Sequence, residues 1–351
     1  MPKPNVIVDR VRSLDLPNRP LVAAQGTGIP GHAIVHLTGG AALLDLSDPR
    51  AAIWEGILDD LRQANEPVYL ETDPNTNVIK QVLYPRSAMV SGLAAAPAGN
   101  LHEVELEISQ ARHYLNTANP DYQQLLNALT VAWQQGTPVL VTETLDDHEI
   151  IDVRPDPAPF AVRPAMMVMP PAGPLGNVPL VAAGVTPQQA QHLFALVASQ
   201  SYIPFKYPDD GCWGRAHEMC RLIIASAVQP RKVWIYGNLM VSTRNHPRCG
   251  VRWGWHVAPT LLVNTGSSSE INVIDPALFP GPVPQATWAS VQHDPNASLY
   301  DTGASVFYRS SSGQVTYDPS YSQTQQVLAR YRRELALRTA QYGPPPYSNC
   351  P

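Results

Sequence analysis

Two stretches in the first half of the chain repeat one order of patterns, and this repetition limits the possible folds more than any other sequence feature. They are residues 32–85 and 102–155, each 54 residues long. Each begins with an alternating apolar and polar run, passes a polar cap with a proline, and continues with apolar residues at helical spacing. A short strand, a turn and a second strand follow in both. We therefore predict a duplicated strand–helix–hairpin unit, in which each copy covers the apolar face of the other.

The apolar positions of the two predicted helices correspond. The matching faces consist of Trp54, Ile57, Leu58 and Leu61 in the first stretch and of Leu125, Ala128, Leu129 and Ala132 in the second. Neither stretch holds a cluster of Cys, His and carboxylate residues that is typical of a site. We therefore expect this half to be structural or regulatory.

Composition excludes several classes of partner. The 351 residues carry a net charge of −5, so no basic surface is available for nucleic acid or anionic lipid. The most apolar run, residues 164–185, is interrupted by five prolines, so we predict no membrane span. The first 20 residues lack the apolar core and cleavage site of a secretory signal. A signal is therefore either absent or was removed before this numbering.

Residues 156–182 contain a proline at about every third or fourth position. This composition is typical of a stiff, extended connector. Two interpretations stay open, because an extended chain with exposed Met, Val and Leu suits a protease cleft, whereas the same composition also suits a spacer that is never cut.

The residues with chemical potential concentrate after this connector. The turn Asp209-Asp210-Gly211 precedes a run with helical spacing, which places Cys212 in the first turn of a helix. A helix N-terminus lowers the pKa of a cysteine and offers free N–H groups to a developing oxyanion. A buried structural cysteine is the alternative for an isolated residue.

A predicted hairpin supplies two partners for this thiol. Residues 253–264 and 270–279 are predicted as its strands, with His256 and Asp275 at similar distances from the turn. Residues so placed in an antiparallel pair lie within side-chain reach. The carboxylate then orients the imidazole, which deprotonates the thiol through its other nitrogen. The order Cys212, His256, Asp275 is found in papain-like and transglutaminase-like enzymes.

Successive blocks of residues 186–318 resemble one family in order. They are FKYPDDGCWGRAHEM, VWIYGNL, WGWHVAPTLLV, VIDPALFPGPV and SVFYRSSSGQVTYD, and they resemble the bacterial protein-glutaminases, which are secreted enzymes that deamidate glutamine side chains in proteins. The resemblance implies that Cys212 is the nucleophile, His256 the general base and acid, and Asp275 the orienting carboxylate. It also implies that the enzyme uses no metal and no cofactor, and that its partners are proteins with exposed glutamine.

Family members have an N-terminal pro-region that covers the active site until a protease removes it, and the resemblance implies the same role for the repeated half. The expected fold is α+β, with a helix-borne cysteine packed on an antiparallel sheet, as in the transglutaminase and papain-like core. We predict an N-terminal duplicated α+β domain (1–155), a linker that is a candidate cleavage region (156–182), and a catalytic domain with a C-terminal helix and tail (183–351). The C-terminal helix should bury Val327, Leu328, Tyr331 and Leu335.

Residues around the triad have two interpretations each. Trp213 and Trp255 either shape a slot for the aliphatic part of glutamine or pack in the core. Trp253 also flanks the triad in sequence and has the same two interpretations. His217 follows the nucleophile by five positions, and we expect a structural histidine rather than a second base.

The chain has four cysteines. If Cys212 stays a free thiol, at most one disulfide forms among Cys220, Cys249 and Cys350.

Three rival interpretations remain. A zinc site would draw on a set of ligand types that comprises Cys212, His217, Cys220, His246, Cys249 and His256. Cys212 and His217 diverge by roughly 140° around a helix, too far to bind one ion together. A transglutaminase or a cysteine protease uses the same triad, and a non-enzymatic module with a vestigial triad is the rival from another class.

Overall fold

The computed structural model describes residues 4–16, 31–95, 100–156 and 184–351. The chain divides into two compact units. The first comprises Met1–Glu107, His113–Pro159 and Arg333–Pro344, and the second comprises Ile108–Arg112, Phe160–Arg332 and Pro345–Pro351. Most of the predicted connector, residues 157–182, lies outside the described residues. None of the helices in the described ranges is long and apolar enough to cross a membrane.

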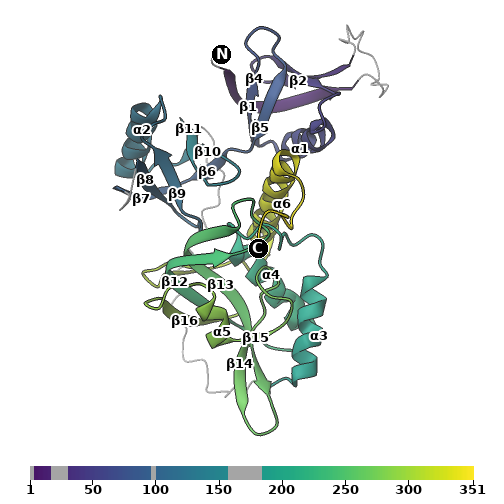
Figure 1. Cartoon of the computed structure of the whole chain (residues 1–351), viewed down its shortest axis with the longest axis vertical. Coiled ribbons are helices and arrows are strands. Elements are labelled where there is room, and N and C mark those ends of the chain that lie inside the picture. The colour runs from purple at the N-terminus through teal and green to yellow at the C-terminus, as the bar shows by residue number, and fades with distance from the viewer. Residues whose placement is uncertain (1–3, 17–30, 96–99, 157–183) are drawn as a thin grey trace. The chain divides into compact units, whose positions relative to one another are not determined.

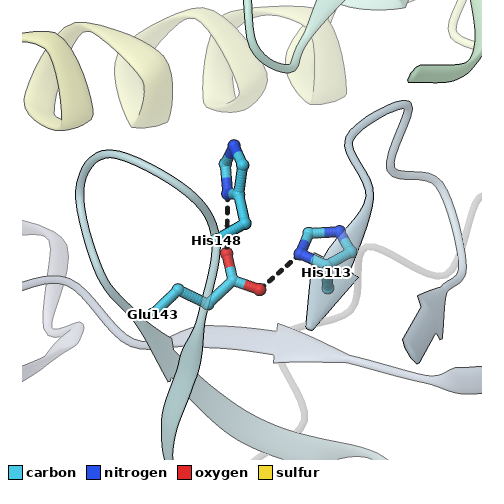
Figure 2. Close-up of side chains that lie close together, drawn as sticks. All are labelled: His113, Glu143 and His148. Carbon is cyan, nitrogen blue, oxygen red and sulfur yellow. Dashed lines mark hydrogen bonds and ion pairs between the residues drawn. The ribbon is translucent and has the colours of Figure 1, made fainter. Parts of the chain in front are cut away.

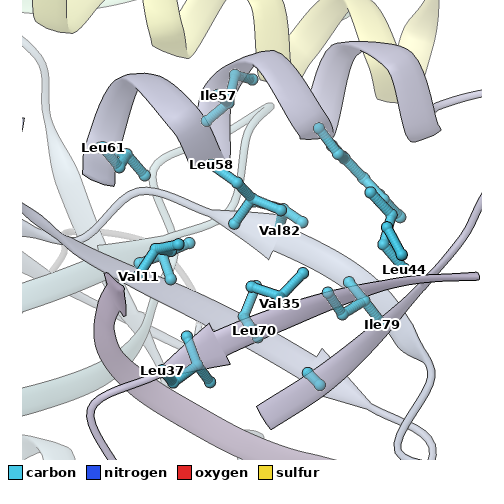
Figure 3. Packing of buried hydrophobic residues seen from close by; sticks show 14 of the residues in the cluster. Val11, Val35, Leu37, Leu44, Ile57, Leu58, Leu61, Leu70, Ile79 and Val82 are labelled. Atoms are coloured by element: carbon cyan, nitrogen blue, oxygen red, sulfur yellow. The ribbon is translucent and has the colours of Figure 1, made fainter. Parts of the chain in front are cut away.

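A five-stranded antiparallel sheet and one helix form the larger part of the first unit (Figure 1). The strand order is β3 (Ala41–Asp45), β2 (His32–Leu37), β1 (Asn5–Asp15), β4 (Pro67–Thr72) and β5 (Ile79–Leu83). Helix α1 (Ala51–Ala64) buries Trp54, Ile57, Leu58 and Leu61, the face expected from the sequence. These side chains form a core with alternate residues of the sheet, including Val35, Leu44 and Leu70 (Figure 3).

Strands of the second predicted stretch form two three-stranded sheets beside helix α2 (Tyr122–Gln135), together with two strands at residues 86–88 and 90–95 that precede the stretch. One sheet has the order β11 (Ile150–Pro155), β10 (Val139–Glu143) and β6 (Arg86–Ala88), and the other has β7 (Val90–Ala95), β8 (Leu101–Leu106) and β9 (His113–Asn116). The helix contributes Leu125, Leu129 and Ala132 to the core between these elements.

The helix and the following hairpin occur in both stretches, but each stretch begins with two strands rather than the single predicted strand. The sheets also differ, because β1 joins the two hairpins of the first stretch into one sheet. Strand β1 lies outside both stretches, so their own patterns did not predict it. Duplication of the unit stays a prediction.

The second unit contains an antiparallel sheet with the order β15 (Val283–Pro284), β14 (Ser269–Val273), β13 (Gly250–Asn264), β12 (Arg231–Ser242) and β16 (Ser298–Gly303). Helix α4 (Cys212–Ala225) contacts β13, and α3 (Pro187–Ala198) contacts both α4 and β13. The unit also holds α5 (Gln285–Ser290) and the pair β17 (Val306–Arg309) and β18 (Val315–Tyr317). Mixed helices and antiparallel sheets agree with the predicted α+β class.

Helix α6 (Ser322–Tyr342) contributes residues to both units. Val327, Leu328 and Tyr331 are buried as expected, whereas Leu335 is only half-buried. Leu335 lies in the part that belongs to the first unit, where Leu337 instead enters the core.

Candidate active site

Cys212 is the first residue of α4, as predicted, and its side chain is buried. The preceding Gly211 has φ of +83°, a left-handed conformation that favours glycine. A Cβ at this position would lie 2.3 Å from Cδ2 of Tyr331. The turn therefore needs glycine both for its backbone conformation and for the close approach of an aromatic ring.

His256 and Asp275 lie together in the same unit. His256 is on β13, and Asp275 follows the end of β14, which pairs with β13. The Nε2 atom of His256 is 2.8 Å from Oδ2 of Asp275. Trp288 donates from Nε1 to the same oxygen at 2.9 Å. The carboxylate therefore holds one imidazole nitrogen and is itself held by a second donor.

The imidazole of His256 lies close to two indole rings. Its centroid is 4.5 Å from that of Trp253 and 5.5 Å from that of Trp288, and both pairs are stacked. Its Nδ1 atom is buried and has no hydrogen-bond partner among the described residues. Nδ1 is thus the nitrogen that stays available for a proton transfer.

The Cys212 thiol accepts a hydrogen bond from the backbone N–H of Val257, the residue after the histidine. Burial raises the pKa of this thiol well above its usual value, and Asp210 and Asp275 raise it further, while Arg215 and the Val257 N–H lower it. The prediction that the helix N-terminus lowers the pKa of Cys212 is wrong for this form of the protein. Burial outweighs the helix end, because the thiolate loses its hydration.

A segment from the first half of the chain, Ile108–Arg112, belongs to this unit. Its Gln110 is fully buried, and its Oε1 accepts a hydrogen bond from the Cys212 backbone N–H at 2.9 Å. Its Nε2 donates to the Pro208 carbonyl at 3.2 Å. No sequence signal pointed to this contact, because about 100 residues separate the two partners and Gln110 lies in the part of the second stretch where the pattern predicted a single strand.

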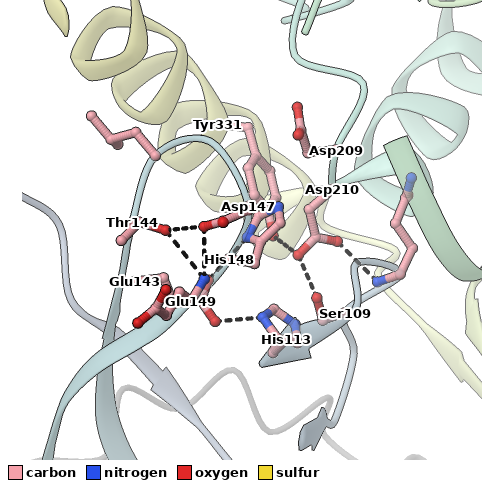
Figure 4. Close-up of polar contacts among 12 residues, drawn as sticks. Ser109, His113, Glu143, Thr144, Asp147, His148, Glu149, Asp209, Asp210 and Tyr331 are labelled. Carbon is pink, nitrogen blue, oxygen red and sulfur yellow. Dashed lines mark hydrogen bonds and ion pairs between the residues drawn. The ribbon is translucent and has the colours of Figure 1, made fainter. Parts of the chain in front are cut away.

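Asp210 binds the same segment (Figure 4). Its carboxylate accepts from the Ser109 hydroxyl at 2.5 Å, from the Gln110 backbone N–H at 3.0 Å and from the Tyr331 hydroxyl at 2.8 Å. The Gly211 N–H also donates to it. Asp210 therefore couples the turn before Cys212 to the segment that carries Gln110, a role that the sequence pattern does not indicate.

Trp213 and Trp255 are both buried, and their ring centroids are 5.7 Å apart. Trp255 donates from Nε1 to the Ser109 carbonyl at 2.9 Å. Trp253 donates to the Asp209 carbonyl at 3.0 Å. Trp255 thus contacts the residue next to Gln110, and a role of Trp213 and Trp255 in binding substrate stays a prediction.

His217 lies in a different polar cluster. Its Nδ1 is 3.0 Å from Nζ of Lys232, and its Nε2 donates to the Asp318 carbonyl at 3.3 Å. Burial, with the charge of Lys232, lowers the pKa of His217 to about 4. The ring is therefore neutral near pH 7, in line with the structural role expected for it.

Cys249 and Cys350 form a disulfide, so one of the possible pairs among the three remaining cysteines is realised. Cys220 is a free, buried thiol, and burial raises its pKa to about 11. Within the described residues, the ligand types of the zinc interpretation do not gather at one point. The sulfur of Cys249 is bonded in the disulfide, and Nε2 of His246 lies 3.0 Å from Oδ1 of Asp209.

A cluster with metal-ligand character lies instead in the first unit (Figure 2). His113 and His148 each direct Nδ1 to the carboxylate of Glu143, the latter at 3.1 Å. Burial lowers the pKa of His113. The pKa of Glu143 is well below its usual value although burial alone raises it, because both histidines interact with the carboxylate. The expectation that the repeated half holds no such cluster is therefore wrong, since two strands and a turn bring together residues that are up to 35 positions apart.

The chain was compared with known proteins. A family model described as Glutaminase matches residues 190–292, which include Cys212, His256 and Asp275. No curated protein sequence matches the chain.

Solved structures give further matches. A crystal structure of a mutant of pro-protein-glutaminase is 25% identical, with a TM-score of 0.52, over 71% of this chain and 93% of the other. A crystal structure of pro-protein-glutaminase is 24% identical, with a TM-score of 0.53, over 77% of this chain and 99% of the other. An NMR structure of protein-glutaminase from Chryseobacterium proteolyticum is 30% identical, with a TM-score of 0.39, over 42% of this chain and 88% of the other.

Proposed function

Because the chain belongs to the protein-glutaminase family, in its pro-enzyme form, we propose that it hydrolyses glutamine side chains of proteins to glutamate and releases ammonia. The observation that carries this proposal is the contact between the Gln110 carboxamide oxygen and the Cys212 N–H, at 2.9 Å. An amide oxygen at the N–H of the nucleophile is where the oxyanion of an acyl transfer forms. The site therefore accepts a glutamine side chain at the position that the reaction requires.

The proposed reaction begins at the thiol of Cys212. His256 takes its proton through Nδ1, the sulfur attacks the carboxamide carbon, and the Cys212 N–H stabilises the oxyanion. The imidazolium then protonates the departing ammonia, which leaves a thioester. His256 next activates water, and glutamate is released.

Asp275 and Trp288 act through the imidazole. The carboxylate of Asp275 fixes Nε2 of His256 at 2.8 Å, so the proton of the neutral ring lies on Nε2 and Nδ1 stays basic. The pKa of Asp275 is below its usual value although burial raises it, because His256 and Trp288 interact with the carboxylate. A charged Asp275 stabilises the imidazolium that forms when the thiol is deprotonated.

The proposal includes a transglutaminase or papain-like core. Its basis is the packing of α4, which carries Cys212, against the antiparallel strand β13, which carries His256. Trp213 and Trp255 are proposed to line the slot for the aliphatic part of the substrate, because Trp255 donates to the carbonyl of Ser109, the residue before Gln110, and the ring of Trp213 lies 5.7 Å from that of Trp255.

We further propose that the enzyme is secreted and latent. Segment Ile108–Arg112 fills the site with Gln110, so a substrate protein must displace it. A protease that cuts within residues 156–182 is the proposed activator. The high pKa of the buried Cys212 thiol fits a resting form in which the nucleophile is protonated.

Ammonia release from a glutamine-containing protein such as casein tests the function. We expect little ammonia from the full chain, release after limited proteolysis, and none from Cys212→Ala. Cys220→Ala is the matched control, because Cys220 is an equally buried free thiol outside the proposed chemistry. Activity that survives Cys212→Ala would refute the assigned nucleophile.

The same samples separate the rival functions. Incorporation of an added primary amine instead of water would indicate a transglutaminase, and backbone cleavage of casein would indicate a protease. If Cys212 in the cut protein resists an alkylating reagent at neutral pH, the non-enzymatic interpretation is favoured.

A further inference from the structure

The glutamine in the site belongs to the chain itself and is held there by contacts on both sides. The backbone N–H of Gln110 donates to Asp210 at 3.0 Å, and its carbonyl accepts from the Gly254 N–H at 2.9 Å. Ala111 forms an antiparallel bridge with Trp253 on β13. The segment is thus held beside strand β13, which carries the candidate histidine, by backbone hydrogen bonds and one isolated antiparallel bridge, similar to the pairing by which peptides are recognised at a strand.

The carboxamide of Gln110 is also positioned as a reactant. Its Oε1 lies 2.9 Å from the Cys212 N–H, and its carbon lies about 1.2 Å from that oxygen. The thiol and the N–H that binds this oxygen belong to one residue. The amide nitrogen contacts the Pro208 carbonyl at 3.2 Å, so oxygen and nitrogen occupy distinct, defined positions.

The general base proposed for this step is His256. The Nδ1 atom of His256 is buried, with no hydrogen-bond partner in the part of the chain that the structure describes. The thiol is bound by the N–H of Val257, the next residue. A glutamine, a thiol, an N–H donor and an available imidazole nitrogen thus meet in one buried site.

We propose that Gln110 is an internal substrate of this site and is converted to glutamate by the chain that carries it. This inference rests on the proposed function and adds that the first glutamine processed is the protein's own. The bond between sulfur of Cys212 and Cδ of Gln110 forms as the bond between Cδ and Nε2 breaks. Nε2 leaves as ammonia with a proton from His256. Water then cleaves the thioester, which leaves a glutamate side chain at position 110 and restores the thiol.

Peptide mass spectrometry of the full-length protein tests the proposal. Trypsin cleavage after Arg86 and Arg112 releases residues 87–112, in which Gln110 is the sole glutamine. The full chain is incubated at neutral pH, denatured and digested, and fragmentation locates any change of amide to acid. The same peptide contains Asn100, which reports spontaneous deamidation during handling.

We expect glutamate at position 110 in the unaltered chain and in Cys220→Ala, and glutamine there in Cys212→Ala and Cys212→Ser. Circular dichroism of the two Cys212 variants checks that they fold. Two results would overturn the proposal: Gln110 intact in the unaltered chain, or its conversion to glutamate to the same extent without the Cys212 thiol.

The casein assay on the cut protein distinguishes this failure from failure of the proposed function. Ammonia release from casein together with intact Gln110 refutes only the internal reaction. Absence of both ammonia release and conversion at position 110 refutes the proposed function as well.

Discussion

A carboxylate in place of the Gln110 carboxamide should weaken the hold of the segment on the site. We consider Gln110→Glu in a His256→Ala background, where the thiol of Cys212 is present but its base is absent. This background keeps position 110 unprocessed in the reference protein, so the two proteins differ only in the group that occupies the site.

The magnitude follows from one lost contact. Nε2 of Gln110 donates to the Pro208 carbonyl at 3.2 Å, and a carboxylate oxygen has no proton to donate there. A buried acceptor left without its partner costs about 1–3 kcal/mol. The bond from the Cys212 N–H is kept, so we take about 2 kcal/mol, which raises the opening constant of the segment roughly thirtyfold.

The assay is the rate at which iodoacetamide labels Cys212 in the uncut protein. The residue is 1% exposed, so labelling requires the segment to open, and the rate follows the opening constant. Cys220 in the same molecule is also buried and reports any general loosening. Gln124→Glu makes the same chemical change at an exposed position of α2 and is the matched control.

Equal labelling rates for the reference and for Gln110→Glu would refute the reasoning, since the carboxamide would then contribute nothing to closure. The reasoning would also be refuted if Gln110→Glu accelerated the labelling of Cys220 as much as that of Cys212, because the substitution would then loosen the whole unit.

Three further substitutions test the supports of the site. Gly211→Ala should lower the free energy of unfolding by at least about 2 kcal/mol in urea titration, because it combines a left-handed backbone with a clash against Tyr331; unchanged stability would contradict this. Trp288→Phe removes the donor to Asp275 and should lower kcat of the cut enzyme about tenfold with KM unchanged; a change confined to KM would point to substrate binding instead. Cys249→Ser removes the disulfide, whose partners are 101 residues apart, and should lower the free energy of unfolding by about 2–4 kcal/mol. Under reducing conditions, the variant and the unaltered protein should have equal midpoints of unfolding.

The local pattern was sufficient for elements whose residues are close in sequence. The apolar spacing of Trp54, Ile57, Leu58 and Leu61 predicted one face of α1, and that face is buried. The turn before Cys212 predicted a helix that begins at this residue. The spacing of apolar residues in a helix or strand reflects the burial of one of its faces. The sequence therefore predicts such an element wherever that face packs against a core.

The sequence did not predict the single strands and segments that depend on distant partners. Strand β1 joins two hairpins, and Ile108–Arg112 joins the second unit. Nothing in either local pattern identifies such a partner. The pairing of Cys249 with Cys350 could not be predicted either, because the number of cysteines alone allowed several pairs.

Spacing and resemblance were sufficient to predict the residues of the proposed chemistry: a thiol at a helix start, a histidine on strand β13 and a carboxylate, which lies just after the end of β14 in the structure. The surroundings of the thiol depend instead on the three-dimensional fold. It buries Cys212 and places the Gln110 carboxamide on its N–H. The pKa of the thiol is then set by desolvation, which depends on what covers the residue in space. Helix position is a local property and burial is not, which is why the sequence predicted a lowered pKa and the structure has a raised one.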